Sequence, residues 1–359
     1  MAKVKIFSAV EQVAGHVKKG LVAGYWRGEM PGVVALAGEL GVNHKTVEAA
    51  LSQLEREGVL VGQGARRPRR VGSFNELAGP SLRIGLVLHE AADLRTELTL
   101  EIRHALQESG HVPFVAKRNI AELGSDIAKV SALLARQPAD AWVVYAAPFE
   151  VLEWFSKGEL PAFAVFGRFR RLPIAAAAPD KTGAYVAAVN SLVRLGHRRI
   201  VLLARPQHRQ PVPSRALQTF LDALTREGIQ VSDYHNPHWE NTCEGFQKCL
   251  ESLFRSTPPS ALIVQESVLL GAVQQFLQAR GIRVPRDVSL VCTDPDPTFA
   301  WRVPTVAHIR WDTGPVIRRI ARWANQVALG KKDRQQLLSK AEFVPGGTIG
   351  PVAAKFRGL

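Results

Sequence analysis

The chain has few of the features that mark secreted or membrane proteins. It contains three cysteines among 359 residues, too few for a disulfide scaffold or a four-cysteine zinc site. No apolar stretch reaches the roughly 18 uninterrupted residues that a membrane-spanning helix needs. Residues 1–5 lead into a mixed segment without a long apolar core, so we expect no export signal. These absences favour the reducing cytoplasm as the location of the protein.

Acidic residues are also scarcer than basic ones. The sequence holds 46 Lys and Arg against 32 Asp and Glu, a net charge of +14. A field of this sign favours polyanionic partners such as DNA, RNA or an anionic membrane surface. The densest basic run is at residues 66–70, which include four arginines. The apolar share of 46% is typical of a folded globular protein, and at about 150 residues per domain the length predicts two or three domains.

The first 71 residues are expected to fold as three helices followed by a β-hairpin. Apolar residues recur at helical spacing over residues 8–20, and Pro31 marks the first turn of a second helix that ends before Gly41. Asn43 can cap a third helix, which ends at Gly58. Because only a short turn separates the second and third helices, they predict a helix-turn-helix, whose second helix can lie in the major groove of DNA.

An apolar strand and a glycine turn follow the third helix. Residues 59–61 are apolar, and Gly62 and Gly64 lie at the turn. This pattern predicts a β-wing that carries the arginine run, whose side chains could contact phosphates or enter the minor groove. The alternative is a surface-exposed basic loop without a partner. The order of helix-turn-helix, glycine turn and arginines favours the wing.

Four short motifs in this unit match one known family. They are MPGVVALA at residues 30–37, VNHKTV at 42–47, ALSQLEREG at 50–58 and GQG at 62–64. On these motifs the first 71 residues resemble the winged helix-turn-helix domain of the GntR family of regulators. Val34 and His44 stand where that family has arginines. Because an arginine contact to a base contributes about 1–3 kcal/mol of discrimination, we expect an altered or relaxed sequence preference.

The motif match and the charge pattern together indicate a set of DNA-contacting residues. They are Asn43, His44, Lys45, Thr46, Arg66, Arg67, Arg69 and Arg70. The four arginines would supply most of the attraction to phosphates, and the residues of the third helix would touch the bases. For His44 the alternative is an exposed helix end with no partner.

A second, larger unit follows a linker. Glycine, serine and proline punctuate residues 72–81, where we place the domain boundary. From Leu82 onward, strand patterns alternate with amphipathic helices, which is typical of an α/β fold with parallel sheets covered on both faces. The unit has roughly 270 residues, more than one such sheet usually needs, so we predict two parallel sheets with a cleft between them. Ligands in such folds collect at the carboxyl ends of the strands.

The sequence contains no recognisable catalytic constellation. It has no GxGxxG after the first strand of the large unit, no GxxxxGK[ST] phosphate loop and no GxSxG turn. His235 and His238 lack a third ligand at a suitable spacing, so we predict no metal. Cys243 and Cys249 are given no function. We therefore expect neither an enzyme nor a bound cofactor.

Longer strings in the large unit match a second family. They are DKTG at residues 180–183, LGHRRIVLL at 195–203, RALQTFLDAL at 215–224, PPSALIV at 258–264, GIRVPRDVSLV at 281–291 and FVPGGTIGP at 343–351. On these strings residues 82–351 resemble the effector-binding and dimerisation domain of the LacI family. The resemblance implies a two-lobed periplasmic-binding-protein fold whose hinge the chain crosses three times. The expected ranges are about 82–196 and 309–330 for lobe 1, and about 197–308 and 340–351 for lobe 2.

The same resemblance implies which residues line a ligand cleft between the lobes. They are Asp180, Arg215, Trp239, Gln265, Glu266 and Asp294. Gln265 and Glu266 replace an Asn-Asp pair of the family with side chains one methylene longer, so we expect an unusual or weakly bound effector. Two of the assignments have alternatives: Asp180 can merely cap its helix, and Trp239 can belong to the core.

Together these patterns predict a cytoplasmic DNA-binding transcription regulator, a repressor, whose operator affinity is changed by a small ligand, a sugar, bound between two lobes. The expected partners are double-stranded DNA, the effector and a second copy of the chain in a homodimer, with no membrane contact. Ligand binding would change the separation of two DNA-binding heads, which must match half-sites about one helical turn apart. The alternative is a soluble sugar-binding protein with a degenerate head, which the replaced arginines favour.

Overall fold

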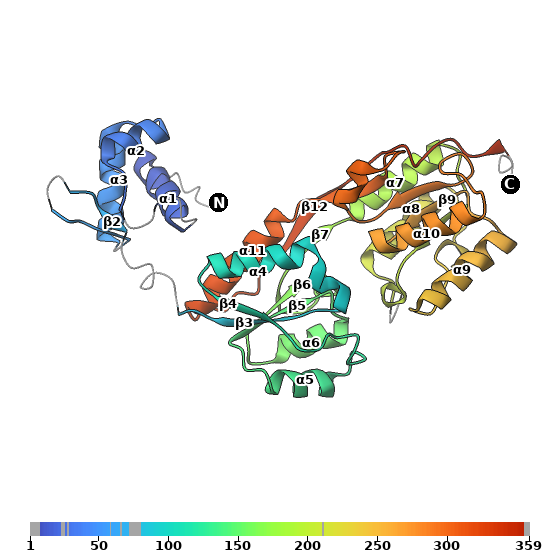
Figure 1. Cartoon of the computed structure of the whole chain (residues 1–359), viewed down its shortest axis with the longest axis horizontal. Helices are drawn as coiled ribbons and strands as arrows, with labels where there is room; N and C mark the ends of the chain where they lie inside the picture. The colour runs from blue at the N-terminus through green and yellow to red at the C-terminus, as the bar shows by residue number, and fades with distance from the viewer. Residues whose placement is uncertain are drawn as a thin grey trace.

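The N-terminal unit holds three helices and a two-stranded ribbon. The computed structural model describes residues 8–22, 26, 29–57, 59–64, 67–71, 80–209 and 212–354. In the N-terminal part these form α1 (Ala9–Val22), α2 (Val33–Leu40), α3 (His44–Arg56), β1 (Leu60–Val61) and β2 (Arg70–Val71). The two strands pair antiparallel, and Figure 1 shows them beside α3. The three helices and the antiparallel strand pair that the sequence predicted are therefore present.

Local sequence signals explain this arrangement. Gly41 ends α2 with a positive φ of 62°, a conformation that glycine adopts without strain. The Asn43 side chain accepts a hydrogen bond of 2.9 Å from the backbone N–H of Lys45 and so caps α3. The apolar faces of the three helices meet in one buried cluster around Val17 and Leu36. The two helices of the motif are thus held at a fixed angle by their own core.

The C-terminal unit is built on ten strands. Their bounds are β3 (Arg83–Val87), β4 (Val112–Val115), β5 (Ala141–Tyr145), β6 (Ala162–Val165), β7 (Ala175–Asp180), β8 (Ile200–Leu203), β9 (Ala261–Val264), β10 (Ser289–Cys292), β11 (Ala307–Trp311) and β12 (Gln336–Val344). Their order across the sheet is β4-β3-β5-β6-β7-β12-β11-β10-β9-β8. Strands β5, β6, β8, β9 and β10 are buried along their whole length, as expected for parallel strands covered on both faces.

The prediction of two separate parallel sheets is wrong, because β12 joins the two halves into one mixed sheet. Residues 336–340 of β12 pair parallel with β7, and residues 341–344 pair antiparallel with β11. The strand is nine residues long, enough to serve both halves. Hydrogen bonding is consequently continuous from β4 to β8.

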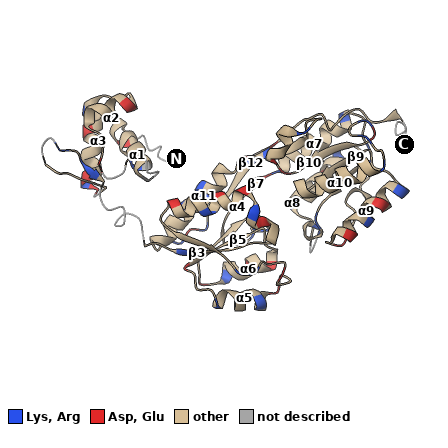
Figure 2. Cartoon of the chain, in the orientation of Figure 1, with Lys and Arg blue, Asp and Glu red and all other residues tan. Residues whose placement is uncertain are grey.

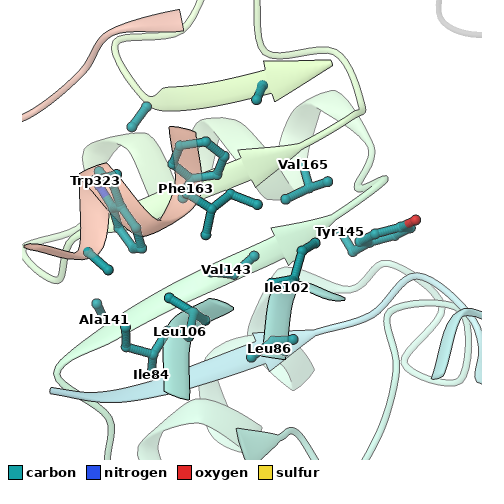
Figure 3. Packing of buried hydrophobic residues seen from close by; sticks show 14 of the residues in the cluster. Ile84, Leu86, Ile102, Leu106, Ala141, Val143, Tyr145, Phe163, Val165 and Trp323 are labelled. Atoms are coloured by element: carbon teal, nitrogen blue, oxygen red, sulfur yellow. The ribbon is translucent and has the colours of Figure 1, made fainter. Parts of the chain in front are cut away.

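Eight helices among the described residues cover the two halves of this sheet. Their bounds are α4 (Glu97–Glu108), α5 (Ile127–Ala135), α6 (Phe149–Lys157), α7 (Thr182–Arg194), α8 (Arg215–Arg226), α9 (Cys243–Ser256), α10 (Ser267–Ala279) and α11 (Gly314–Ala328). One face of the first half packs against α4 and α11 and its other face against α5 and α6. Figure 3 shows Trp323 of α11 beside Phe163 of β6, with ring centroids 5.3 Å apart. In the second half, α7 and α8 cover one face and α9 and α10 the other.

No described helix has the length and apolar character needed to cross a membrane.

The packing defines two lobes whose borders differ from the predicted ones. Ala184, Tyr185 and Ala188 of α7 pack with Ile200 of β8, so the chain leaves lobe 1 at Lys181 rather than near residue 196. Strand β11 pairs with β10 and therefore belongs to lobe 2, which extends to residue 311 rather than 308. Among the described residues, lobe 1 then comprises 80–181 and 312–340, and lobe 2 comprises 182–209, 212–311 and 341–354. With these borders the chain passes between the lobes near residues 181, 311 and 340.

Candidate functional site

The N-terminal end of α3 presents polar side chains to the outside. Asn43, His44 and Lys45 are exposed and Thr46 is half-buried, whereas Val47 and the following apolar positions face the core. The Asn43 carboxamide oxygen is already used as the helix cap. The exposed first turn of α3 is therefore available to a partner, and the core behind it holds the turn in place.

The arginine run on the wing divides into two kinds of residue. Arg66 lies outside the described residues. Arg67 and Arg70 are exposed, but the Arg69 side chain is only 18% exposed and is held by two carboxylates of α3. Its Nε donates to Oε1 of Glu55 at 2.9 Å, and a terminal nitrogen contacts Oε1 of Glu48 at 3.2 Å. The Arg69 guanidinium, which the sequence predicted to contact phosphates, is thus engaged in ion pairs within the unit.

A second polar site lies between the two lobes of the C-terminal unit. It is formed by residues that follow the carboxyl ends of parallel strands, where open α/β sheets bind ligands. Lobe 1 contributes His89, Glu90, Asp93, Tyr145, Phe166 and Arg168, and lobe 2 contributes Arg205, His208, Gln265, Glu266 and Asp294. Contacts across the lobes bring the two sets together.

Arg205 is the centre of this site. Its guanidinium binds the carboxylate of Glu266 through two nitrogens, at 2.8 and 3.1 Å, and donates to the side-chain oxygen of Asn241 at 3.0 Å. It also reaches Glu90 of the opposite lobe at 3.5 Å. Burial raises the pKa of Glu266, and the charge of Arg205 opposes that rise. Arg205 therefore stabilises a partly buried carboxylate and connects the two lobes.

A second ion pair joins the hinge to lobe 2. Lys181 Nζ lies 2.5 Å from Oδ1 of Asp294, and Oδ2 of Asp294 accepts from the Thr293 hydroxyl and the Glu266 backbone N–H. Burial alone would raise the pKa of Asp294, but the positive charge of Lys181 and these hydrogen bonds outweigh burial and lower it. Asp294 is accordingly a charged acceptor at the base of the site.

His208 and Arg168 make a third set of contacts in the interlobe site. A terminal nitrogen of Arg168 in lobe 1 donates to the carbonyl oxygens of Gln207 and His208 in lobe 2, at 3.1 and 3.2 Å. Burial, with the nearby charges of Lys181 and Arg168, lowers the pKa of His208 to about 4. The imidazole is therefore neutral at physiological pH, and its Nε2 lies 2.7 Å from the Gln265 amide nitrogen.

Aromatic rings line the same region near the hinge. Phe166 meets Tyr145 edge to face at 5.3 Å and Trp311 at 5.5 Å. Within the described part of the chain, the buried indole nitrogen of Trp311 and Nδ1 of His89 have no hydrogen-bond partner. Phe166 and Glu266 have positive φ values of 61° and 65°, and such strain in non-glycine residues concentrates at functional sites. The region thus combines aromatic rings with two buried polar atoms that lack a partner among the described residues.

The six predicted ligand residues fall into three groups. Gln265, Glu266 and Asp294 lie in the interlobe site, as described above. Asp180 ends β7, and its Oδ1 accepts from the backbone N–H and the hydroxyl of Thr182, the first residue of α7. Arg215 starts α8, is exposed, and lies close enough to Asp180 to help lower the pKa of that carboxyl, a fall that burial opposes.

Trp239 is a correction to the predicted ligand set. Its side chain is buried in the core of lobe 2, 4.8 Å from the Phe246 ring, and its N–H donates to the Ala204 carbonyl at 2.9 Å. It therefore cannot stack on a ligand in the interlobe site. Sequence reasoning missed Arg205 and Lys181. Lys181 directly follows β7, and Arg205 lies two residues after the end of β8, at the ends of strands where ligand-binding side chains were expected.

Comparisons with known proteins agree with this fold. Residues 189–349 match the family described as periplasmic binding protein-like domain. The chain is similar to the HTH-type transcriptional regulator AglR of Rhizobium meliloti, with 35% identity over 117 residues and 32% of each chain covered. It thus spans about a third of the length of curated relatives such as AglR.

Solved structures extend the likeness over most of the large unit. The transcriptional regulator CelR in complex with cellobiose has a TM-score of 0.62 at 19% identity, covering 89% of this chain and 100% of CelR. The lac repressor dimer bound to operator and the anti-inducer ONPF has a TM-score of 0.61 at 19% identity, covering 77% of this chain and 97% of the repressor chain. At this identity the comparison shows a shared fold.

Proposed function

We propose that the chain is a transcription repressor whose DNA affinity is controlled by a small ligand bound between its lobes. The observation that carries the proposal is the combination, in one chain, of an exposed helix-turn-helix with a basic wing and a two-lobed unit with a polar interlobe site. A GntR-type head is supported by the motifs at residues 30–64. AglR, CelR and the lac repressor are named as regulators of transcription, which supports a regulatory rather than an enzymatic role.

The proposed effector is a sugar. Its polar groups would meet Gln265 and the carboxylates of Glu266 and Asp294, and its apolar ring face would lie on Phe166 or Trp311. The cations Arg205 and Lys181 already face carboxylates, which favours an uncharged, hydroxyl-rich ligand. Arg215 at the rim would add hydrogen bonds to hydroxyls. The cellobiose in the CelR complex supports this class of ligand.

The proposed assembly is a homodimer that meets through an apolar face of lobe 2. Val268, Trp301 and Val303 are 71%, 89% and 98% exposed, and large apolar side chains of this kind mark interaction sites when they gather. The short helix η5 (Pro297–Trp301) lies against α10, because Arg302 donates to Gln274 of that helix. A two-fold dimer would present two heads to a symmetric DNA site.

The mechanism we propose is a shift between lobe orientations. A ligand that contacts both lobes favours the orientation in which those contacts form, and the separation of two heads in a dimer then changes. Couplings of this kind are typically about 1–3 kcal/mol, enough to alter operator occupancy several-fold. Competition for the Glu90–Arg205 contact, at 3.5 Å the longest ion pair of the site, is the proposed first step.

The test uses the full-length chain and fluorescent duplex DNA. We expect binding at low salt whose log–log salt dependence has a slope of about −0.9 for each phosphate neutralised. Addition of neutral sugars, chosen by a thermal-shift screen in which saturating ligand stabilises by about 2.7 kcal/mol at 100 times its dissociation constant, should change that affinity. Absence of salt-sensitive DNA binding alongside sugar binding would favour the alternative, a soluble sugar-binding protein with a degenerate head.

A further inference from the structure

Arg69 joins three parts of the N-terminal unit. Its side chain bridges Glu48 and Glu55 of α3, and its backbone carbonyl accepts a hydrogen bond of 2.8 Å from the N–H of Met30, just before α2. An isolated bridge between Glu29 and Arg70 continues the same contact. The residue thus ties the wing to both helices of the helix-turn-helix. Figure 2 shows acidic and basic positions side by side where α3 meets the wing.

The two carboxylates lie on the outward side of α3. Glu48 is exposed and stands four residues after His44, on the same face of the helix, and Glu55 follows about two turns later. A face that approaches DNA with two bare carboxylates would repel the phosphates. The Arg69 guanidinium is planar and presents several donors in a fixed fork, so one side chain can hold both acids at once.

We propose that Arg69 is a positioning residue of the DNA-binding head, not a phosphate contact. It fixes the wing against α3 and cancels the negative charge of Glu48 and Glu55, so that Arg67 and Arg70 are presented to the phosphates. This inference rests on the proposed DNA binding. It separates one arginine of the run from its neighbours by geometry, since Arg67 and Arg70 are exposed and Arg69 is not.

The experiment measures DNA affinity of the full-length chain in two backgrounds. Arg69→Ala is made in the wild type and in a Glu48→Gln/Glu55→Gln background, and each protein is titrated against a random-sequence fluorescent duplex over a salt series. In the wild type we expect Arg69→Ala to weaken binding at least about fivefold, a loss in the range of one charge-assisted contact. In the carboxamide background the same change should cost much less, because the acids that Arg69 bridges are gone.

Arg70→Ala is the matched control. It removes the same charge from the adjacent position, and its loss should be equal in both backgrounds, with the salt slope reduced by about 0.9. Arg69→Lys supplies a second discriminator. An ammonium keeps the charge but cannot fork between two carboxylates, so a positioning role predicts incomplete recovery, whereas a phosphate contact predicts nearly full recovery. Far-ultraviolet circular dichroism and thermal unfolding establish that each variant is folded.

Two outcomes separate the ideas. If the wild type binds DNA but Arg69→Ala costs the same in both backgrounds, Arg69 is a phosphate contact and the positioning role is overturned while the proposed function stands. If the wild type shows no salt-sensitive binding, the proposed function itself fails. A variant with reduced stability in both backgrounds is judged by the Arg69→Lys comparison, made at a temperature where all variants are folded.

Discussion

Replacing Arg205 with methionine is the sharpest test of the interlobe site. The Arg205 side chain is 15% exposed, and its guanidinium makes two short contacts to Glu266 and one to Asn241. Hydrogen bonds to charged groups contribute about 1.5–3 kcal/mol each, and breaking a fully buried pair costs about 3–5 kcal/mol. Because the Glu266 side chain is 34% exposed and solvent screens part of the interaction, we expect a loss of about 2–3 kcal/mol in the free energy of unfolding.

The loss of stability caused by Arg205→Met should also depend on pH. Burial already raises the pKa of Glu266, and Arg205 opposes the rise, so its removal should raise the pKa further. A carboxyl whose pKa is higher in the folded state stabilises that state at low pH, and this contribution is lost as the pH rises through the folded-state pKa. The deficit of Arg205→Met should therefore be larger at about pH 8 than at about pH 5.

The assay is urea unfolding followed by tryptophan fluorescence at both pH values. Glu90→Gln is the control, because it removes the charge behind the 3.5 Å contact across the lobes while the amide oxygen can still accept in the capping box of residues 90–93; this half-exposed contact should contribute less than about 1 kcal/mol. The reasoning is refuted if Arg205→Met costs no more than Glu90→Gln, or if its deficit is the same at the two pH values.

Three further predictions address the core, the ligand set and the assembly. Trp323→Ala should lower the free energy of unfolding by about 3–5 kcal/mol, because a buried ring against Phe163 is lost; a cost below about 1 kcal/mol in chemical denaturation would contradict that packing. Trp239→Phe should cost about 1–3 kcal/mol through the lost hydrogen bond to the Ala204 carbonyl yet leave sugar affinity measured by calorimetry unchanged, and a large drop in affinity would return Trp239 to the ligand site. Trp301→Glu should shift the chain toward monomer in analytical ultracentrifugation, whereas an unchanged dimer would place the interface elsewhere.

Local signals in the sequence predicted the N-terminal unit well. The turn at Gly41 and the cap at Asn43 each act within a few residues, so their chemistry is readable from neighbours in the chain. The wing followed from adjacent apolar and glycine positions. The different role of Arg69 was hidden, because its partners Glu48 and Glu55 precede it by 21 and 14 residues, and a run of four arginines looks uniform in sequence.

Long-range pairing accounts for what the sequence did not predict in the larger unit. The single mixed sheet depends on β12 meeting β7 and β11, which are distant in the chain. The family resemblance implied that Trp239 lines the ligand cleft, but its neighbours in space place it in the core. Arg205 was missed because its importance comes from Glu90 and Glu266, 115 and 61 residues away. Residues that follow the strand ends do gather in one polar region, but the sequence did not identify every residue in it.

The shared strand β12 restricts how the lobes can move. Its first five residues pair with β7 in lobe 1 and its last four pair with β11 in lobe 2. A large hinge opening at this crossing would therefore have to break hydrogen bonds between these strands. Rotation about the long axis of the strand keeps those bonds, because sheets tolerate variable twist between neighbouring strands. The strand therefore allows the lobes to twist relative to each other more readily than to separate. A bound molecule would act on the rest of the protein by changing a twist angle, and the backbone amides near Leu338–Ala341 should exchange slowly with and without it.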